Sequence, residues 1–463
     1  MPRPEFNARS AIALLAVFGV VLAGALALVM RPGSVPGTAP TGVSALGRRV
    51  LVVATHPDDE VLTAGGTISQ LIASGAKVRV VIVTAGDAYA AAAREMTRST
   101  GPEAFRALAE MRRTESMAAA ADLGLAPRDV VRLGYADSGT SLMWDASWDA
   151  SHTFTGRDGS AVVPYAWALR PGAPECGSAL TADLAAQIED FRPDTVISPD
   201  PRETNSDHAA VAAFTMLALD DTGFEGMHLT AIVHFKGFPR PTAYLPSSRL
   251  APPPQLTDSG ARWLALPLDA VSLRAKTAAL RRYGSQLGVA DLGVYMRAFL
   301  RRNELYCLRA ASVPATSVAD ARPAVGSIGT VSVTPPPVIA SARPNPVRVL
   351  SLRMVRGPRR VWFGLVCAGS ADEASYTLAL RLPGAPGVLR RLDLGIADDH
   401  PTALAVDPSS ITTADLTAVR DGDTMWVSVP ASIFSDAKWA LASCGASLPG
   451  YGPSHTPWVD VRP

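Results

Sequence analysis

Short apolar runs rich in β-branched residues alternate with stretches of helical periodicity over the first two thirds of the chain. The run 49–55 is followed by an amphipathic stretch over 60–74 and by a second run over 77–84. Strand, helix and strand within about 35 residues form a βαβ unit, which predicts a parallel sheet. The same alternation predicts further strands over 129–133, 194–198 and 229–235, and helices over 102–123, 181–191, 209–219, 269–283 and 291–302. We therefore expect an α/β fold with a mostly parallel sheet.

A different pattern begins near residue 347. Alternating stretches such as 361–366 and 376–380 are separated by turn residues, and this spacing predicts a smaller antiparallel β-sandwich over 347–463. Residues 311–346 contain three consecutive prolines at 335–337 and read as a linker. The sandwich carries no evident catalytic cluster, so its role stays unknown, and binding and spacing are both open.

The N-terminus has its own pattern. Residues 11–30 form an uninterrupted uncharged run, long enough to cross a hydrocarbon core of about 30 Å. Arg3 and Arg9 precede the run, which favours a cytoplasmic N-terminus. We expect residues 1–30 to be an uncleaved membrane anchor, or alternatively a signal of a secreted protein, followed by a flexible linker over 31–47. The predicted location is the cell membrane, single-pass, with an extracytoplasmic catalytic domain.

Composition adds two expectations. The chain has 463 residues, which is too long for one ordinary hydrophobic core. Its formal net charge is +1, which gives no electrostatic basis for binding nucleic acid. It contains four cysteines, and the simplest pairing outside the cytoplasm is Cys176 with Cys307 and Cys367 with Cys444. Four cysteines allow three connectivities, so the sequence alone leaves the pairing open.

The candidate chemistry is concentrated in residues 55–60, Thr-His-Pro-Asp-Asp-Glu, at the end of the first predicted strand. His56 and Asp59 are three residues apart, so one turn can direct both toward a single ion. Imidazole and carboxylate suit zinc, and a catalytic zinc site takes three protein ligands. Asp58 then remains free to act as a base. The alternative interpretation is an acidic first turn of a helix, which the helix dipole favours.

A third ligand has to come from elsewhere in the chain. The predicted strand 194–198 is followed by a polar stretch that ends in His208 at a helix start. The carboxyl ends of parallel strands meet at one edge of the sheet, so His208 can complete the site. We interpret His234, inside an apolar run, as a core or rim residue.

Residues 138–177 show no clear period and contain several aromatic side chains, including Trp144 and Trp148. A long loop of this kind in a compact domain is typical of a functional lid or an insert. The two tryptophans could stack on sugar rings and bind substrate, or they could form a local hydrophobic cluster. The sequence favours neither interpretation over the other.

Together these motifs resemble the LmbE-like, GlcNAc-phosphatidylinositol de-N-acetylase (PIG-L) family. The resemblance rests on residues 55–60, close to the family's AHPDDE signature, and on Asp207-His208. Supporting matches are Arg112 to Glu115, Leu133 to Asp137, Lys276, and Ser285-Gln286. In order and spacing they cover about residues 48–308, which places the catalytic domain at 48–310.

The resemblance implies a Rossmann-like fold and a Zn²⁺ cofactor. His56, Asp59 and His208 would be the zinc ligands and Asp58 the general base. Arg112 or Arg113 and Asp137 would lie near the substrate. The implied reaction is hydrolysis of the acetyl group of an N-acetylated amino sugar, in a glycan or glycolipid: zinc acidifies a water molecule and polarises the acyl oxygen, and Asp58 moves the proton.

Two positions depart from the family pattern. Relatives often have a histidine three residues before the last ligand, where this chain has Asn205, and Tyr283 likewise replaces a histidine before the Ser-Gln pair. An amide donates a hydrogen bond to an oxyanion but cannot act as a general acid near neutral pH. A catalytically weak glycan-binding protein and a hydrolase of another amide or an ester are the alternative functions.

Overall fold

The protein is described here by a computed structural model. The residues that it describes are 42–257, 262–309, 313–314, 316–317, 329–332, 347–368, 374–384, 388–397, 400–406, 415–435, 437, 439–449, 454–456 and 458–462.

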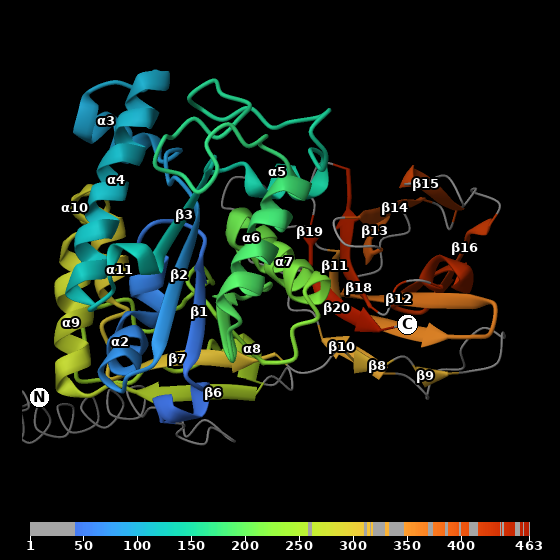
Figure 1. Cartoon of the computed structure of the whole chain (residues 1–463). Helices are drawn as coiled ribbons and strands as arrows, with labels where there is room; N and C mark the ends of the chain where they lie inside the picture. The colour runs from blue at the N-terminus through green and yellow to red at the C-terminus, as the bar shows by residue number, and fades with distance from the viewer. Residues whose placement is uncertain are drawn as a thin grey trace, which may run out of the picture. The chain divides into compact units, whose positions relative to one another are not determined.

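Residues 49–308 contain a seven-stranded sheet with the order β3-β2-β1-β4-β5-β7-β6 (Figure 1). The first five strands in this order are parallel, and β7 and β6 complete the sheet in antiparallel pairing. Its strands are β1 (Arg49–Ala54), β2 (Lys77–Thr84), β3 (Val130–Tyr135), β4 (Thr195–Pro199), β5 (Met227–Ala231), β6 (Arg262–Pro267) and β7 (Asn303–Leu308). The predicted mostly parallel α/β fold is confirmed.

Helices pack on both faces of this sheet because alternate residues of β1 point in opposite directions. Val50, Val52 and Ala54 enter one core, whereas Leu51 and Val53 enter the other. The helices are α2 (Asp59–Ala73), α3 (Ala90–Thr97), α4 (Pro102–Asp122), α5 (Thr140–Asp145), α6 (Gly177–Phe191), α7 (Ser206–Asp221), α8 (Pro254–Thr257), α9 (Ala270–Arg281), α10 (Gly284–Leu287) and α11 (Ala290–Arg297). Short 3₁₀ turns occur at Val43–Leu46, Pro127–Asp129 and Ala431–Phe434.

The C-terminal region forms two further sheets, as the alternating pattern predicts. Strands β10-β11-β12-β17-β16 are antiparallel neighbours, with β9 beside β11. Strands β15-β14-β13-β18-β20-β8 form the second sheet, with β19 beside β18. The bounds are β8 (Val313–Pro314), β9 (Thr316–Ser317), β10 (Gly329–Ser332), β11 (Arg348–Arg356), β12 (Arg360–Ala368), β13 (Ser375–Pro383), β14 (Leu389–Ala397), β15 (His400–Val406), β16 (Thr417–Asp421), β17 (Thr424–Pro430), β18 (Ala440–Ser447), β19 (Ser454–His455) and β20 (Val459–Arg462). Since β8, β9 and β10 fall within 311–346, the predicted linker supplies three strands to these sheets.

The predicted disulfides are wrong. All four cysteines are buried free thiols. Cys176 and Cys307 lie in hydrophobic cores on opposite faces of the parallel sheet, so they cannot pair. Cys367 and Cys444 pack in the core between the C-terminal sheets, where each thiol behaves as a small apolar side chain.

The predicted membrane span over residues 11–30 lies outside the described residues. Within the part of the chain that the structure describes, none of the helices combines the length and the apolar character needed to span a bilayer. This finding contradicts the predicted single-pass, extracytoplasmic localisation, and we correct that prediction by withdrawing it.

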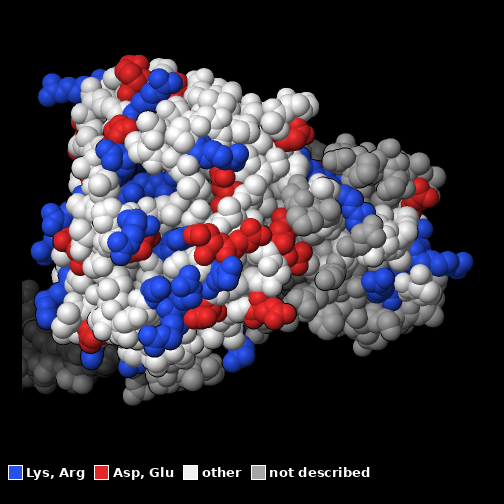
Figure 2. All heavy atoms as spheres, viewed as in Figure 1, with Lys and Arg blue, Asp and Glu red and all other residues white. Residues whose placement is uncertain are grey.

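Charges on the described surface are mixed. On the face drawn in Figure 2, basic and acidic side chains are interspersed. The formal net charge of +1 agrees with this distribution.

Candidate functional site

Two neighbouring parallel strands position the candidate ligands. His56 follows the end of β1 and Asp59 opens α2, while His208 lies in the first turn of α7, just after β4. β1 pairs with β2 on one side and with β4 on the other, so the chain changes direction across the sheet between them. Ligands of open α/β sheets bind at such a switch point, outside the carboxyl ends of the strands.

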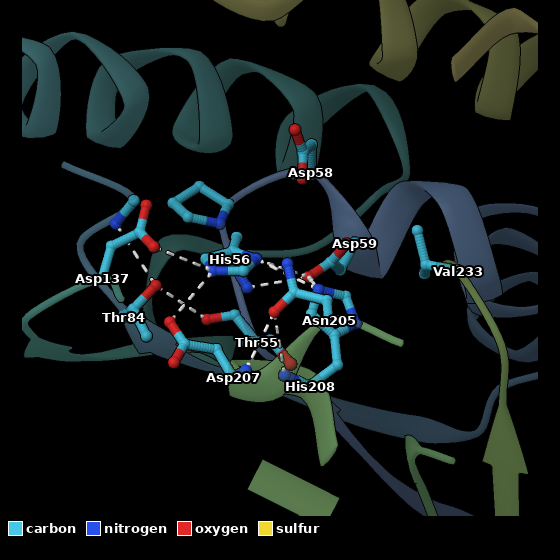
Figure 3. A network of polar contacts seen from close by, with 12 residues as sticks. Thr55, His56, Asp58, Asp59, Thr84, Asp137, Asn205, Asp207, His208 and Val233 are labelled. Carbon is cyan, nitrogen blue, oxygen red and sulfur yellow. Dashed lines mark hydrogen bonds and ion pairs between the residues drawn. The ribbon is translucent and has the colours of Figure 1, made fainter. Parts of the chain in front are cut away.

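Three donor atoms of these residues meet in a buried cluster (Figure 3). His56 Nδ1 lies 3.1 Å from His208 Nε2 and 3.5 Å from Asp59 Oδ2, and His208 Nε2 lies 3.3 Å from Asp59 Oδ2. Ligand atoms at about 2.0–2.1 Å from a tetrahedral zinc centre are separated by about 3.3 Å. Both the spacing and the donor types, two imidazoles and one carboxylate, therefore fit a zinc ion.

The electrostatics of this cluster favour a cation. Burial alone would raise the pKa of Asp59, but the charges of His208 and His56 outweigh it and hold that pKa far below its usual range. The pKa of His208 is raised despite burial, because Asp59 and Glu203 stabilise its charged form. The carboxylate of Asp59 therefore stabilises positive charge on the two neighbouring imidazoles, and it would stabilise a bound cation in the same way.

Two further carboxylates face the other ring nitrogen of His56. His56 Nε2 lies 3.2 Å from Asp137 Oδ1 and 3.7 Å from Asp207 Oδ2. Asp207 also accepts the backbone N–H of Ser138 over 2.6 Å. Outer carboxylates of this kind fix the tautomer and orientation of a metal-ligating histidine and increase its basicity.

Asp58 lies apart from the ligand cluster, toward α4 (Figure 3). Its Oδ2 accepts a hydrogen bond from Arg112 Nη2 over 3.0 Å, and the same guanidinium also donates to the carbonyl oxygens of Pro57 and Gly86. Burial raises the pKa of Asp58 to about 7, although the charge of Arg112 acts in the opposite direction. A carboxyl group with a pKa near neutral pH is suited to taking up and returning a proton.

Asn205 is the N-cap of α7. Its Oδ1 accepts the backbone N–H groups of Asp207 over 2.9 Å and of His208 over 3.4 Å. Asparagine is among the best N-cap residues, which explains the helix start beside the ligand His208. Because the amide oxygen is engaged with the helix, the amide nitrogen is the group that Asn205 can offer to the adjacent cavity.

A cavity of about 310 Å³ opens over this cluster. It is lined by His56, Asp58, Asp59, Leu62, Ala88, Tyr89, Arg112, Asp137, Ser138, Asn205, His234, Gln286, Leu292, Tyr295 and Met296. This volume lies at the lower end of the range for small-molecule sites. Arg112 and Asp137, two of the predicted substrate-binding residues, thus border the cavity.

The other three predicted substrate-binding residues lie elsewhere, and we correct these assignments. Arg113 points away from Arg112, as adjacent positions of a helix do, and pairs with Glu110 over 3.0 Å. Trp144 is 1% exposed, and its ring packs edge-on against Phe214. Trp148 stacks on the same Phe214 ring. Of the two interpretations of this aromatic loop, the structure supports the local hydrophobic cluster.

Sequence reasoning missed part of the cavity wall. His234 lies beyond the end of β5 at Ala231, not inside a strand, and its ring packs edge-on against His208 at 4.8 Å. Burial lowers the pKa of His234 to about 3, so this ring is neutral. Tyr295 and Met296 come from α11, whose distance from the motifs in sequence left no signal.

The chain is similar to known proteins over part of its length. The family model of GlcNAc-PI de-N-acetylases (PIG-L) matches residues 51–219. The 1D-myo-inositol 2-acetamido-2-deoxy-alpha-D-glucopyranoside deacetylase of Rhodococcus jostii (strain RHA1) is 31% identical over 180 residues, which are 38% of this chain and 54% of that protein. The enzyme of the same name from Mycobacteroides abscessus is 28% identical over 264 residues, covering 54% of this chain and 85% of that protein.

The match spans about half the length of the Rhodococcus relative. Among solved structures, the A40926 pseudoaglycone deacetylase Dbv21 is similar at 21% identity, with a TM-score of 0.38, over 56% of this chain and 96% of that one. The family match over 51–219 includes His56, Asp58, Asp59, Asn205 and His208. Over residues 51–219 the chain is therefore similar to the GlcNAc-PI de-N-acetylase (PIG-L) family that its motifs resemble.

Proposed function

We propose that this protein is a zinc-dependent deacetylase that hydrolyses the N-acetyl group of an N-acetylated amino sugar. The observation that carries the proposal is the cluster of His56 Nδ1, Asp59 Oδ2 and His208 Nε2, with separations of 3.1 to 3.5 Å, next to a cavity that His56, Asp59 and Asp58 line. The family match over residues 51–219 supports it, as do the names of the relatives, which are deacetylases of an acetamido sugar.

The cofactor is part of the proposal. His56, Asp59 and His208 would hold the zinc ion, which when bound supplies Lewis-acid polarisation of the acyl oxygen and acidification of a water molecule. Asp207 and Asp137 would hold the His56 ring in place through its Nε2. The substrate amide is then placed between this cluster and Asp58.

The protein's own groups account for the proton transfers. Asp58 accepts a proton from the attacking water as the water oxygen bonds to the acyl carbon, and returns it to the nitrogen as the carbon–nitrogen bond breaks. The products are acetate and the free amine. Asn205, through its amide nitrogen, donates a hydrogen bond to the oxygen that becomes negatively charged.

Arg112 has a positioning role in this scheme. Its guanidinium is already engaged by Asp58, Gly86 and Pro57, so it orients the base and keeps part of that carboxyl group ionised. Asp137 borders the cavity with a carboxylate that can accept a hydrogen bond from a sugar hydroxyl. The proposed partner is therefore a neutral N-acetylated sugar or glycan.

The test uses the purified full-length chain with one equivalent of zinc. We expect acetate release from N-acetylglucosaminides, and a loss of about 10²- to 10⁴-fold in kcat for Asp58→Asn with zinc content unchanged. Asp149→Asn is the matched control, since this aspartate is 62% exposed on its side chain and lies outside the cavity. Equal rates for Asp58→Asn and the wild-type protein, or a wild-type protein that binds no metal, would contradict the proposal.

A further inference from the structure

The cavity is lined by two chemically different sets of side chains. Asp137, Ser138 and Asn205 offer hydrogen-bonding groups, whereas Leu62 on α2 and Leu292, Tyr295 and Met296 on α11 present apolar surface. We name this second set the apolar wall. His56, Asp58 and Asp59 line the same cavity, and the scissile amide must be placed beside them.

Helical spacing builds the apolar wall next to the ligands. Leu62 follows Asp59 by three residues on α2, and Leu292 and Met296 are four residues apart on α11, so each pair lies on one face of its helix. The Tyr295 ring stacks on His234 at 5.8 Å and 10°, and His234 packs against His208. The apolar wall is therefore continuous with the imidazole of a proposed zinc ligand.

Polar groups of the wall are already engaged. Tyr295 donates its hydroxyl hydrogen to the carbonyl oxygen of Val233, so it presents a ring to the cavity rather than a hydroxyl group. Among the described residues that line the cavity, the single Lys or Arg side chain is Arg112, which is held by Asp58. The apolar wall thus offers nothing to phosphate or to sugar hydroxyls, whose burial without partners is unfavourable.

We propose that the apolar wall binds the acyl chain of the substrate, and that the preferred acyl group is an unbranched chain longer than acetyl. This inference rests on the proposed function. The sugar needs hydrogen-bonding partners and so is placed at Asp137 and Asn205, which leaves the apolar side chains of Leu62, Leu292 and Met296 for the acyl substituent of the amide. The reaction is the same hydrolysis, and it releases a longer carboxylate and the same amine.

The test compares N-acetyl-, N-butanoyl-, N-hexanoyl- and N-octanoyl-glucosamine with the zinc-loaded full-length chain. Each methylene group that becomes buried should raise kcat/KM roughly fourfold until the wall is covered. We therefore expect hexanoyl to exceed acetyl by at least tenfold. A flat series, or one that falls from acetyl onward, would overturn the proposal.

A variant pair on one helix sharpens the test. Leu292→Gln removes apolar surface from the wall and should lower the ratio of hexanoyl to acetyl kcat/KM by roughly fourfold or more. Val294→Gln is the matched control, because Val294 lies on the same helix, is 50% exposed and does not line the cavity. If the ratio of hexanoyl to acetyl kcat/KM is unchanged in Leu292→Gln, the apolar wall does not bind the acyl chain.

The two proposals fail in different ways. If the zinc-loaded protein hydrolyses none of the four amides, the proposed function is wrong. If it hydrolyses the acetyl compound and gains nothing from longer chains, the proposed function stands and the acyl-chain inference is wrong. The wild-type series decides this even where Leu292→Gln fails to fold.

Discussion

The carboxylate of Glu60 accepts the backbone N–H of Asp58 over 3.0 Å, from two residues further along the chain. Tyr283 donates its hydroxyl hydrogen to the other oxygen of the same carboxylate. Asp58 needs this support because its φ of 133° lies in a region that non-glycine residues rarely adopt, at a cost of about 1–3 kcal/mol. Glu60 and Tyr283 therefore fix the backbone from which the proposed base extends.

Removing the Tyr283 hydroxyl group should misplace Asp58 without touching the ligands. We expect Tyr283→Phe to lower kcat by roughly 5- to 100-fold, with KM and zinc content close to wild type, because small displacements of a catalytic group are costly. Steady-state kinetics and metal analysis measure this. Tyr244→Phe, at a residue 53% exposed, is the control. An equal change in KM and kcat, or loss of zinc, would point to general disruption instead.

Asn205 combines a structural and a chemical role, and two substitutions separate them. Aspartate caps helices about as well as asparagine but has no donor, so Asn205→Asp should keep the unfolding free energy within about 0.5 kcal/mol while kcat falls roughly 10²- to 10³-fold. Alanine removes both functions and should also cost about 1 kcal/mol of stability. Urea unfolding and kinetics on the same samples distinguish the two. If Asn205→Asp turns over like wild type, the amide nitrogen is not the donor.

Zinc should stabilise the folded chain through His208. A ligand that binds only the native state at 100 times its Kd adds about 2.7 kcal/mol, so zinc should raise the Tm of the wild-type protein. We expect His208→Ala to abolish this zinc-dependent rise. His152→Ala should preserve it, since this histidine is 77% exposed on its side chain and lies outside the cluster. The measurement is calorimetry with and without a chelator, and a zinc-dependent rise that persists in His208→Ala would rule out that ligand.

The stability of the fold should also depend on Glu175. This side chain is 1% exposed, and burial raises its pKa to about 8. The unfolded carboxyl has a pKa near 4.3, so between about pH 4.5 and pH 8 the folded state binds more protons and the stability falls as pH rises. Glu175→Gln removes this charge and keeps an acceptor for the N–H of Ala136, 3.1 Å away.

We therefore expect the difference in unfolding free energy between Glu175→Gln and wild type to grow in favour of the variant by roughly 1–3 kcal/mol from pH 5 to pH 8. Chemical unfolding at several pH values measures it. Glu189→Gln, at an exposed position of α6, should leave the pH dependence unchanged. Parallel curves for Glu175→Gln and wild type would show that the buried carboxyl group does not titrate in this range.

The elements that sequence predicts well are those with a strong period and local end signals. The helix 102–123 is observed as α4, because proline opens it and Gly124 follows its C-terminus. The edge strand β6 and its neighbour β7 were missed, since each is a short run that becomes a strand only by pairing with its neighbours. The predicted strand 229–235 ends early at Ala231, and this shortening exposes His234 to the cavity.

The site was predictable where it depended on strand ends and not where it depended on packing. His56, Asp59 and His208 follow strands that a parallel sheet must align at one edge, and the structure places them together. Whether Trp144 and Trp148 could reach a substrate depends instead on how residues 138–177 fold, and both rings pack against Phe214. The contribution of α11 to the cavity likewise depends on tertiary contacts that leave no local pattern.

The pairing of β1 with β4 has a consequence for the order of folding. His56 and His208 are 152 residues apart in the sequence, and they come together only when β4 pairs with β1. Contacts of such long sequence separation form slowly. Zinc capture during refolding would therefore report on a late step, and a stopped-flow signal from the metal should lag behind the formation of α2 and α4. The rate of zinc binding during refolding would then measure the rate at which β4 pairs with β1.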